Sequence, residues 1–273
     1  MKVPGMAFVR RFFTSAVLIG LTVYLIFFMP PLYFSLQVAA FIALALYEFF
    51  TLLKTTQVPV YRTFGVGMGL LIPLVVYLEF GATQSGEVLF IVFGCLFLFL
   101  LQFFRKNNPQ ALVGISLTLF GILYVSWFLS FLIKIRFLED GAIWVGYLLA
   151  VTKSEDIGAY TMGKLFGRHP LAPHVSPKKS IEGAFGGLVA SILASVALRP
   201  FLPLSFSMLH AVMLGLSIGL VGQIGDLSES LMKRFCGAKD SGGLLPGMGG
   251  VLDAVDSILF TAPIFYFHLK IYL

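Results

Sequence analysis

The stretch VLFIVFGCLFLFLLQFF, from Val88 to Phe104, contains no charged residue. It approaches the roughly 20 apolar residues that a helix needs to cross about 30 Å of hydrocarbon. Its apolar residues run as a continuous block and do not alternate with polar ones, which favours a helix over a strand of a membrane barrel. The stretch therefore predicts a membrane-spanning helix.

Eight further apolar segments lie on both sides of this one. They are Phe12–Met29, Leu32–Leu53, Thr63–Phe80, Ala111–Ile133, Ala142–Met162, Ala184–Leu198, Ser207–Asp226 and Val251–Ile271. Because the bilayer rather than a soluble core would bury their apolar surface, the length of the chain gives no count of domains. The sequence predicts an all-α, polytopic integral membrane protein with about nine transmembrane helices.

The composition excludes an ordinary soluble domain. Of the 273 residues, 58% are hydrophobic and only 12% are charged, whereas soluble domains are nearer half apolar and a quarter charged. The net charge of +6 would suit a nucleic acid, but no soluble basic domain is present to bind one. We therefore expect no nucleic-acid partner.

The basic residues indicate which ends of the helices face the cytoplasm. With the N-terminus inside and nine spans, Lys134, Arg136, Arg199 and Lys270 fall outside and Lys153 falls within a span, which leaves 14 of the 19 Lys and Arg residues in cytoplasmic segments. The positive charge is thus mostly a property of the cytoplasmic face. There it suits anionic lipid headgroups and nucleotide phosphates.

The acidic residues divide the chain into two parts. Residues 1–150 hold five of the 13 acids, namely Glu48, Glu79, Glu87, Glu139 and Asp140. Most of them lie near ends of predicted helices, where a solvated charge needs no special role. Residues 151–273 hold the other eight, several of them within apolar sequence. Carboxylates at membrane depth are costly unless they are paired, metal-bound or facing a polar cavity. We expect apolar transmembrane helices in 1–150 and a catalytic region with a cytoplasm-facing polar cavity in 151–273.

The first charged motif is VTKSEDIGAYTMGKLFG, residues 151–167. On a helix, Lys153, Asp156 and Tyr160 have the spacing i, i+3, i+7 and share one face. One interpretation is a polar wall beside a substrate cavity. The other is a buried Lys–Asp pair that only neutralises itself, and the motif alone leaves both open.

The second motif is SPKKSIEGAFGG, residues 176–187. Its polar side chains are those of Ser176, Lys178, Lys179, Ser180 and Glu182. Two cations and a hydroxyl donor form a reasonable set for binding phosphate oxygens. The alternative is a basic cytoplasmic loop followed by a helix-packing motif at Gly183 and Gly187.

The third motif is GDLSESLMKRFCGAKDSGGLLPGMGGVLDAVD, residues 225–256. Its charged residues are Asp226, Glu229, Lys233, Arg234, Lys239, Asp240, Asp253 and Asp256. Gly249 and Gly250 follow a Pro-Gly pair and predict a backbone turn that can approach a ligand closely. Asp253 and Asp256 have the spacing i, i+3 on the first turn of the last helix. Their mutual repulsion predicts a metal or a positive partner, although the helix N-terminus partly offsets it.

Carboxylates, cations and a glycine turn together suit nucleotidyl transfer. Magnesium would bridge a triphosphate and the carboxylates, and lysine and arginine would balance the charge of the leaving pyrophosphate. The nucleophile would already be an anionic phosphate oxygen, so the reaction needs no strong general base. We accordingly expect none of the four histidines to be catalytic.

At these residues the sequence resembles the phosphatidate cytidylyltransferase (CDP-diacylglycerol synthase) family. The family signature runs G-D-x-x-E-S, S-x-x-K-R-x4-K-D-x-G, P-G-H-G-G and D-R-x-D. Its counterparts are Gly225, Asp226, Glu229, Ser230, Lys233, Arg234, Lys239, Asp240, Gly242, Pro246, Gly247, Gly249, Gly250, Asp253 and Asp256. The segments D-x-G-A-Y and S-P-x-K-[ST]-x-E-G also appear, at 156–160 and 176–183. The match covers most of residues 150–260, whereas the first 150 residues match only in being apolar.

The resemblance implies that the chain joins CTP to phosphatidate, giving CDP-diacylglycerol and pyrophosphate. It implies dependence on Mg²⁺, with a second cation left open, and metal ligands at Asp226, Asp253 and Asp256. The groups that would hold phosphates, with Lys233 and Lys239 counted as catalytic, are Lys178, Lys179, Lys233, Arg234 and Lys239. Further substrate contacts would come from Lys153, Asp156, Tyr160, Ser176, Ser180, Glu182, Asp240, Gly249 and Gly250.

The resemblance also implies a location and partners. The lipid would enter laterally from the inner (plasma) membrane and CTP from the cytoplasm, which the N-terminus and the active site would face; a homodimer is an expectation of the family alone. Two residues depart from the signature, since Met248 replaces a histidine and Ala254 an arginine. A cationic contact is therefore either missing or supplied from elsewhere, for example by Lys153.

Other functions remain open. CTP-dependent polyprenol or dolichol kinases have a similar membrane core and would transfer the γ-phosphate to a lipid alcohol. A transporter of an anionic solute would also use buried charges and glycine-interrupted helices, although the charged motifs occupy one half of the chain and no pair of inverted repeats is evident. A degenerate homologue would bind CTP or lipid without turnover.

Overall fold

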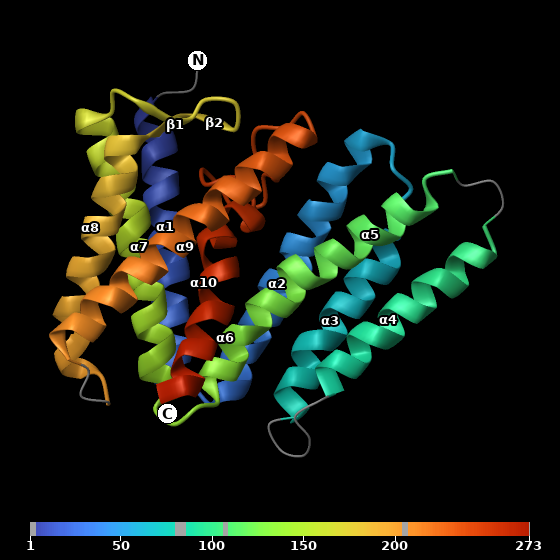
Figure 1. The fold of residues 1–273 in the computed structure, drawn as a ribbon, viewed down its shortest axis with the longest axis horizontal. Coiled ribbons are helices and arrows are strands. Elements are labelled where there is room, and N and C mark those ends of the chain that lie inside the picture. Colours follow the sequence, from blue (N-terminus) through green and yellow to red (C-terminus); the bar gives the residue numbers. More distant parts are fainter. Residues whose placement is uncertain (1–3, 80–85, 106–108, 204–206, 273) are drawn as a thin grey trace. The chain divides into compact units, whose positions relative to one another are not determined.

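A computed structural model describes residues 4–79, 86–105, 109–203 and 207–272. Nearly all of its regular structure is helical (Figure 1). The longer helices are α1 (Pro4–Phe27), α2 (Pro31–Leu53), α3 (Arg62–Glu79), α4 (Gly86–Phe103), α7 (Gly141–Phe166), α8 (Ile181–Leu198), α9 (Met208–Phe235) and α10 (Val251–Tyr272). Helices α5 (Ala111–Gly121) and α6 (Phe128–Arg136) continue into each other through the π-helical turn η2 (Ile122–Trp127). The predicted all-α class is confirmed.

Each of the nine predicted apolar segments is helical over nearly all of its described residues; the exceptions are the segment ends Phe28, Met29, Phe104 and Ser207. The predicted end at Phe80 lies outside the described residues. By length and composition, six helical segments of the described chain can cross a membrane. They are Pro31–Thr56, Gly86–Phe103, Ala111–Arg136, Ile181–Phe201, Met208–Phe235 and Val251–Tyr272. Phe13–Phe27 and Arg62–Leu78 are shorter apolar helices. The chain is thus a polytopic membrane protein, and the count of nine spans stays a prediction.

The chain folds into two compact units, and each is described by itself. The first comprises residues 1–137 and 236–254, and the second comprises residues 138–235 and 255–273. The predicted boundary at residue 150 separates apolar helices from a catalytic region and does not describe how the helices pack. It stays a prediction.

The core of the first unit lies where α2 packs against α3. Leu46 and Phe50 are fully buried on α2, and a Cβ at Gly69 or Gly65 of α3 would collide with them. Glu87 of α4 is also buried; it pairs with Lys134 of α6 and accepts a hydrogen bond from Trp127 Nε1 at 3.1 Å. The expectation of a solvated acid is therefore wrong for Glu87, because a neighbouring helix supplies its partners.

In the second unit, α8 packs between α7 and α9. A Cβ at Gly183 would lie 2.9 Å from the carbonyl oxygen of Ala159, and one at Gly215 would lie 2.8 Å from Ile192 Cα. Small residues let membrane helices approach closely. The predicted packing role of the Gly183/Gly187 motif is therefore confirmed, and it acts between helices of one chain.

A short antiparallel hairpin leads into α8. Strand β1 (Pro170–Ala172) pairs with β2 (Ser176–Ser180), with Pro170 opposite Ser180. Ser180 then serves as the N-cap of α8, because its Oγ accepts the Gly183 N–H at 3.1 Å. Short 3₁₀ turns lie at the ends of two helices: η1 (Lys54–Thr56) follows α2, and η3 (Arg199–Phe201) follows α8.

Candidate functional site

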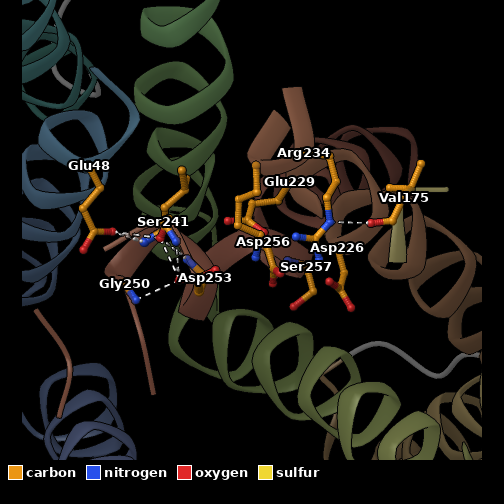
Figure 2. Close-up of polar contacts among 12 residues, drawn as sticks. Glu48, Val175, Asp226, Glu229, Arg234, Ser241, Gly250, Asp253, Asp256 and Ser257 are labelled. Carbon is orange, nitrogen blue, oxygen red and sulfur yellow. Dashed lines mark hydrogen bonds and ion pairs between the residues drawn. The ribbon is translucent and has the colours of Figure 1, made fainter. Parts of the chain in front are cut away.

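In the first unit, a glycine-rich loop leads into the N-terminus of α10. Asp253 lies in the first turn of this helix. Its Oδ2 accepts hydrogen bonds from the N–H groups of Gly250, at 2.8 Å, and Ser241, at 3.0 Å, and from Ser241 Oγ, at 2.8 Å (Figure 2). A carboxylate three positions into a helix that accepts the N-cap N–H forms half of a capping box. Asp253 thus fixes the loop to the helix.

The turn before α10 has the backbone that the glycines predicted. Gly247 has φ +80° and Gly249 has φ +101°, in the region that L side chains rarely adopt. The Leu245 N–H donates to the Gly249 carbonyl at 2.9 Å and closes the turn. Helix α1 also contacts it: Thr14 Oγ1 donates to the Pro246 carbonyl at 3.1 Å, and Ser15 Oγ lies 3.3 Å from Met248 Sδ.

Sequence reasoning missed one acid that contacts this loop. Glu48 of α2 is 2% exposed, so the expectation of a solvated charge is wrong for it as well. Its Oε2 accepts hydrogen bonds from the Leu252 N–H, at 2.9 Å, and from Ser241 Oγ, at 3.2 Å. The available signal was a carboxylate within the apolar segment 32–53. Lys239 and Asp240, which precede the loop, have exposed side chains.

In the second unit, α7 and α10 bring together a group of polar side chains. Lys153 Nζ donates to Asp156 Oδ2 at 2.7 Å and to Ser257 Oγ at 3.2 Å, and Ser257 Oγ lies 3.3 Å from Asp156 Oδ2. The Ser257 N–H donates to Asp256 Oδ1 at 2.6 Å. Asp256 and Asp226 also act electrostatically on Lys153. Lys153 therefore belongs to a larger charged group, and an isolated, self-neutralising pair does not describe it.

Helix α9 contributes the other half of this group. Asp226 Oδ2 lies 2.6 Å from Lys179 Nζ of β2, and Figure 2 shows Asp226, Glu229 and Asp256 close to one another. Gly225 makes this approach possible, because a Cβ there would lie 2.5 Å from the Asp256 carbonyl oxygen. Asp226 and Asp256 also interact electrostatically.

The remaining basic residues of α9 have partners of their own. Lys233 pairs with Glu229, which is fully buried. Arg234 Nε donates to the Val175 carbonyl at 3.1 Å and so ties α9 to the hairpin (Figure 2). A second acid that sequence reasoning did not single out, Glu155 of α7, is 2% exposed and interacts with Asp156.

The other predicted residues lie around the hairpin. Glu182 accepts hydrogen bonds from the N–H groups of Arg168, at 3.0 Å, and His169, at 3.3 Å, and its Oε1 lies 2.6 Å from His169 Nδ1. Lys178 and Tyr160 are exposed, and Ser176 begins β2. The second unit thus brings together Lys153, Asp156, Lys179, Asp226, Lys233 and Asp256. Ser180 caps α8, and Glu182 in its first turn accepts hydrogen bonds from residues 168 and 169; their roles as substrate contacts stay predictions.

Only Asp253 of the predicted aspartate pair lies in the first turn of α10, and Asp256 follows one turn later. Within the described ranges, no three or more His, Cys, Asp or Glu side chains are grouped so that they could hold a metal ion by themselves. Both cysteines, Cys95 and Cys236, are free thiols.

Comparison with known proteins gives one family. A model of the cytidylyltransferase family matches residues 9–272. The chain is 33% identical to a phosphatidate cytidylyltransferase of Synechocystis sp. over 271 residues, covering 88% of this chain and 89% of that protein. The family match includes most of the first 150 residues, which the sequence motifs left unassigned.

Two further relatives match over shorter stretches. The uncharacterized protein YnbB of Escherichia coli is 41% identical over 157 residues, which are 58% of this chain and 52% of that protein. A phosphatidate cytidylyltransferase of Bacillus subtilis is 37% identical over 151 residues, or 55% of this chain and 56% of that protein. The chain spans about half the length of these two relatives.

Proposed function

Since this chain belongs to the cytidylyltransferase family, we propose that it joins CTP to phosphatidate, giving CDP-diacylglycerol and pyrophosphate. The resemblance inferred from the motifs is confirmed by the family match. The identity of the lipid substrate comes from the names of the Synechocystis and Bacillus relatives.

The observation that carries the proposal is the charged group of the second unit. Its acids, Asp156, Asp226 and Asp256, lie with Lys153 and Lys179 on α7, α9, α10 and β2. Such a group suits a reaction between two phosphate compounds, because lysines can hold phosphate oxygens and carboxylates can hold the accompanying cation. Neighbouring helices keep these charges close together before any substrate binds.

In the proposed reaction, an anionic oxygen of the phosphatidate phosphate attacks the α-phosphorus of CTP. A new O–P bond forms, the bond between the α-phosphorus and the oxygen bridging it to the β-phosphorus breaks, and pyrophosphate leaves with that electron pair. No proton has to be removed from the nucleophile, so lysines that orient and neutralise phosphates are sufficient. Lys153, Lys179 and Lys233 would have this role, with Lys178, Arg234 and Lys239 as further phosphate contacts.

The carboxylates fit Mg²⁺ in chemical type. Proteins usually hold Mg²⁺ through one or two carboxylates, and substrate phosphates and waters complete its coordination, so the absence of a three-residue group among the described side chains is compatible with a site. Asp226 and Asp256, brought together where Gly225 contacts α10, would hold the ion, and Asp253 is kept as a proposed ligand. Bound there, Mg²⁺ would neutralise the triphosphate.

We further propose that the site faces the cytoplasm and that the protein lies in the inner (plasma) membrane. The bias of Lys and Arg toward the predicted inner segments supports this orientation. A homodimer is proposed at the level of the family alone. Met248, which departs from the family signature, lies against Ser15 of α1, and Lys153 is the proposed source of a cationic contact to the substrates.

The test is an assay of purified protein in detergent with phosphatidate, Mg²⁺ and CTP labelled in the cytidine or in the γ-phosphate. Cytidine label in the lipid together with γ-label in pyrophosphate is the expected result. Asp256→Asn should abolish it, and the matched control Asp140→Asn, at an exposed loop position, should not. Transfer of γ-label to a lipid alcohol would indicate a kinase instead, and solute flux in vesicles without chemical change would indicate a transporter.

A further inference from the structure

The first turn of α10 lacks a side-chain cap of its own. Helices begin with N–H groups that have no partner within the helix, and an N-cap side chain usually accepts one of them. The residue before α10 is Gly250, which has no side chain. The Leu252 N–H instead donates to Glu48 Oε2, at 2.9 Å, from helix α2. Glu48 thus caps this N–H, although it lies 204 residues earlier in the chain. Ser241 Oγ accepts the next one, the Asp253 N–H, at 3.3 Å.

The same carboxylate oxygen also holds the loop. Ser241 Oγ lies 3.2 Å from Glu48 Oε2 and 2.8 Å from Asp253 Oδ2. A hydroxyl has one hydrogen to donate, so the two carboxylates share it. Ser241 consequently connects Glu48 of α2 to Asp253 of α10, and both ends of the loop 241–250 contact this group.

The glycines of the loop are fitted around Glu48. A Cβ at Gly242 would collide with Glu48 Oε1, and a Cβ at Gly250 would collide with Ser241 Oγ and Glu48 Oε2. Neither position can take a larger residue while Glu48 remains where it is. At Gly250 the absence of a side chain is thus required by the contact with Ser241 and Glu48.

The burial of the Glu48 carboxylate is unfavourable in free energy. The side chain is almost fully buried, and its Oε1 has no hydrogen-bond partner among the described residues. Burying a carboxylate with one oxygen unpaired costs stability. The helix N-terminus offsets part of that cost, because it favours a negative charge.

We propose that Glu48 is a positioning residue for the transfer reaction: it caps α10 from α2 and holds the loop 241–250 so that the helix presents its aspartates correctly. This inference rests on the proposed function, because Asp253 and Asp256 are the proposed metal ligands. In this proposal Glu48 acts through the loop and the helix, and Asp253 and Asp256 hold the metal. Helix α2 therefore supports the start of α10, on which Asp253 lies, through the Glu48 carboxylate.

The test compares two substitutions of similar size. Glu48→Gln keeps a carbonyl oxygen that can accept from both Leu252 and Ser241, whereas Glu48→Met keeps the volume and removes the acceptor. Gln37→Met, a polar residue elsewhere on α2 that bonds Thr22 at 2.9 Å, is the matched control. The first readout is amide hydrogen exchange of peptides covering 241–253, measured by mass spectrometry without substrate. The hairpin 168–180 serves as the internal reference.

Glu48→Met should speed exchange of the 241–253 peptides by about tenfold or more, because the Leu252 N–H and the Ser241 hydroxyl lose the acceptor that holds the loop to the helix. Glu48→Gln and Gln37→Met should exchange like the unmodified protein, and the hairpin should not change in any variant. In the transfer assay, Glu48→Met should lower kcat by about tenfold or more while the KM for CTP changes by less than about threefold. Glu48→Gln should restore kcat to within about fivefold.

Three results would overturn the proposal. Unchanged exchange in Glu48→Met would show that Glu48 does not cap α10. Fast exchange in Glu48→Gln would show that an acceptor oxygen at this position is not enough to hold the loop. Fast exchange with an unchanged kcat in Glu48→Met would remove the positioning role. If the unmodified protein shows no transfer, the proposed function fails, and the exchange measurement still decides whether Glu48 caps α10.

Discussion

Lys179 Nζ of strand β2 lies 2.6 Å from Asp226 Oδ2 of helix α9, and both side chains are partly exposed. Solvent-exposed ion pairs contribute only about 0–1 kcal/mol to stability. The pair is therefore a weak explanation for the fold of the hairpin. The Glu182 carboxylate already accepts the Arg168 N–H just before it, and Arg234 Nε donates to the Val175 carbonyl within it. Because the Lys179 side chain is partly exposed, its ammonium group can instead exchange the Asp226 carboxylate for the phosphate of an arriving substrate.

Replacement of Lys179 tests this role. Lys179→Met should lower kcat/KM for CTP by about 10- to 100-fold, because hydrogen bonds to charged groups contribute roughly 1.5–3 kcal/mol. The melting temperature should change by less than about 2 °C, since the exposed pair adds little stability. Lys164→Met, at the end of the neighbouring helix α7, is the control and should keep its activity. A large fall in melting temperature with unchanged kcat/KM would mean that the pair is structural.

The contact between α9 and α10 gives a second prediction. At Gly225 a Cβ would meet the Asp256 carbonyl oxygen at 2.5 Å and Ser257 Cα at 3.3 Å, and these are backbone atoms that cannot rotate away. Gly225→Ala should therefore destabilise the protein by about 1–3 kcal/mol, as overpacking does, and should lower activity. Thermal unfolding followed by size-exclusion chromatography measures the first effect.

Gly67→Ala is the matched control for that measurement, because nothing lies within 4 Å of its Cβ position on α3. It should be neutral or slightly stabilising, since alanine favours a helix by about 1 kcal/mol over glycine. Equal melting temperatures for the two variants would show that α9 and α10 do not meet at Gly225.

Much of this architecture was predictable because local sequence determines it. Charge-free runs such as 88–104 form helices, and the glycines at 247 and 249 take the positive φ angles that a turn between Pro246 and α10 requires. The grouping of Lys153, Asp156, Asp226 and Asp256 was also predictable, because each is a charge within apolar sequence. The hairpin at 170–180 was missed, since strands of three and five residues containing prolines show no clear alternation.

The role of Glu48 could not be read from the sequence in the same way. Its partners, Ser241 and Leu252, lie 193 and 204 residues away in the chain, and no local periodicity reports such a contact. The rule applied to the second half, that a carboxylate in an apolar run needs a partner, would have selected it. Glu48 was overlooked because it lies toward the end of the predicted helix 32–53, where an acid can be solvated.

Asp226 and Asp256 should affect catalysis directly, whereas Asp253 should also affect the stability of the loop 241–250. Asp226→Asn and Asp256→Asn should each lower kcat by about 100-fold or more, because each removes a charge from the proposed metal site. Loop exchange should stay normal, since neither residue bonds the loop 241–250 in the structure. Asp253→Ala, by contrast, should speed exchange of the loop, because it removes the acceptor of Gly250 and Ser241. A Mg²⁺ titration of activity, with loop exchange measured in parallel, distinguishes the two effects.

The thiol of Cys236 gives the last prediction. Burial raises its pKa above the ordinary value of 9.0, and the hydrogen bond with Thr55 offsets the effect only in part. Because the thiolate is the reactive form, Cys236 should react with maleimide more slowly than a free thiol between pH 7 and pH 9, and the rate should still be rising above pH 9. The raised pKa also means that the neutral thiol favours the folded state. This contribution is present below the unfolded pKa and is lost as the pH rises through the folded one. Labelling in a Cys95→Ser background, folded and then denatured, measures the difference. A rate that levels off near pH 8 in the folded protein would show that the thiol is not shielded.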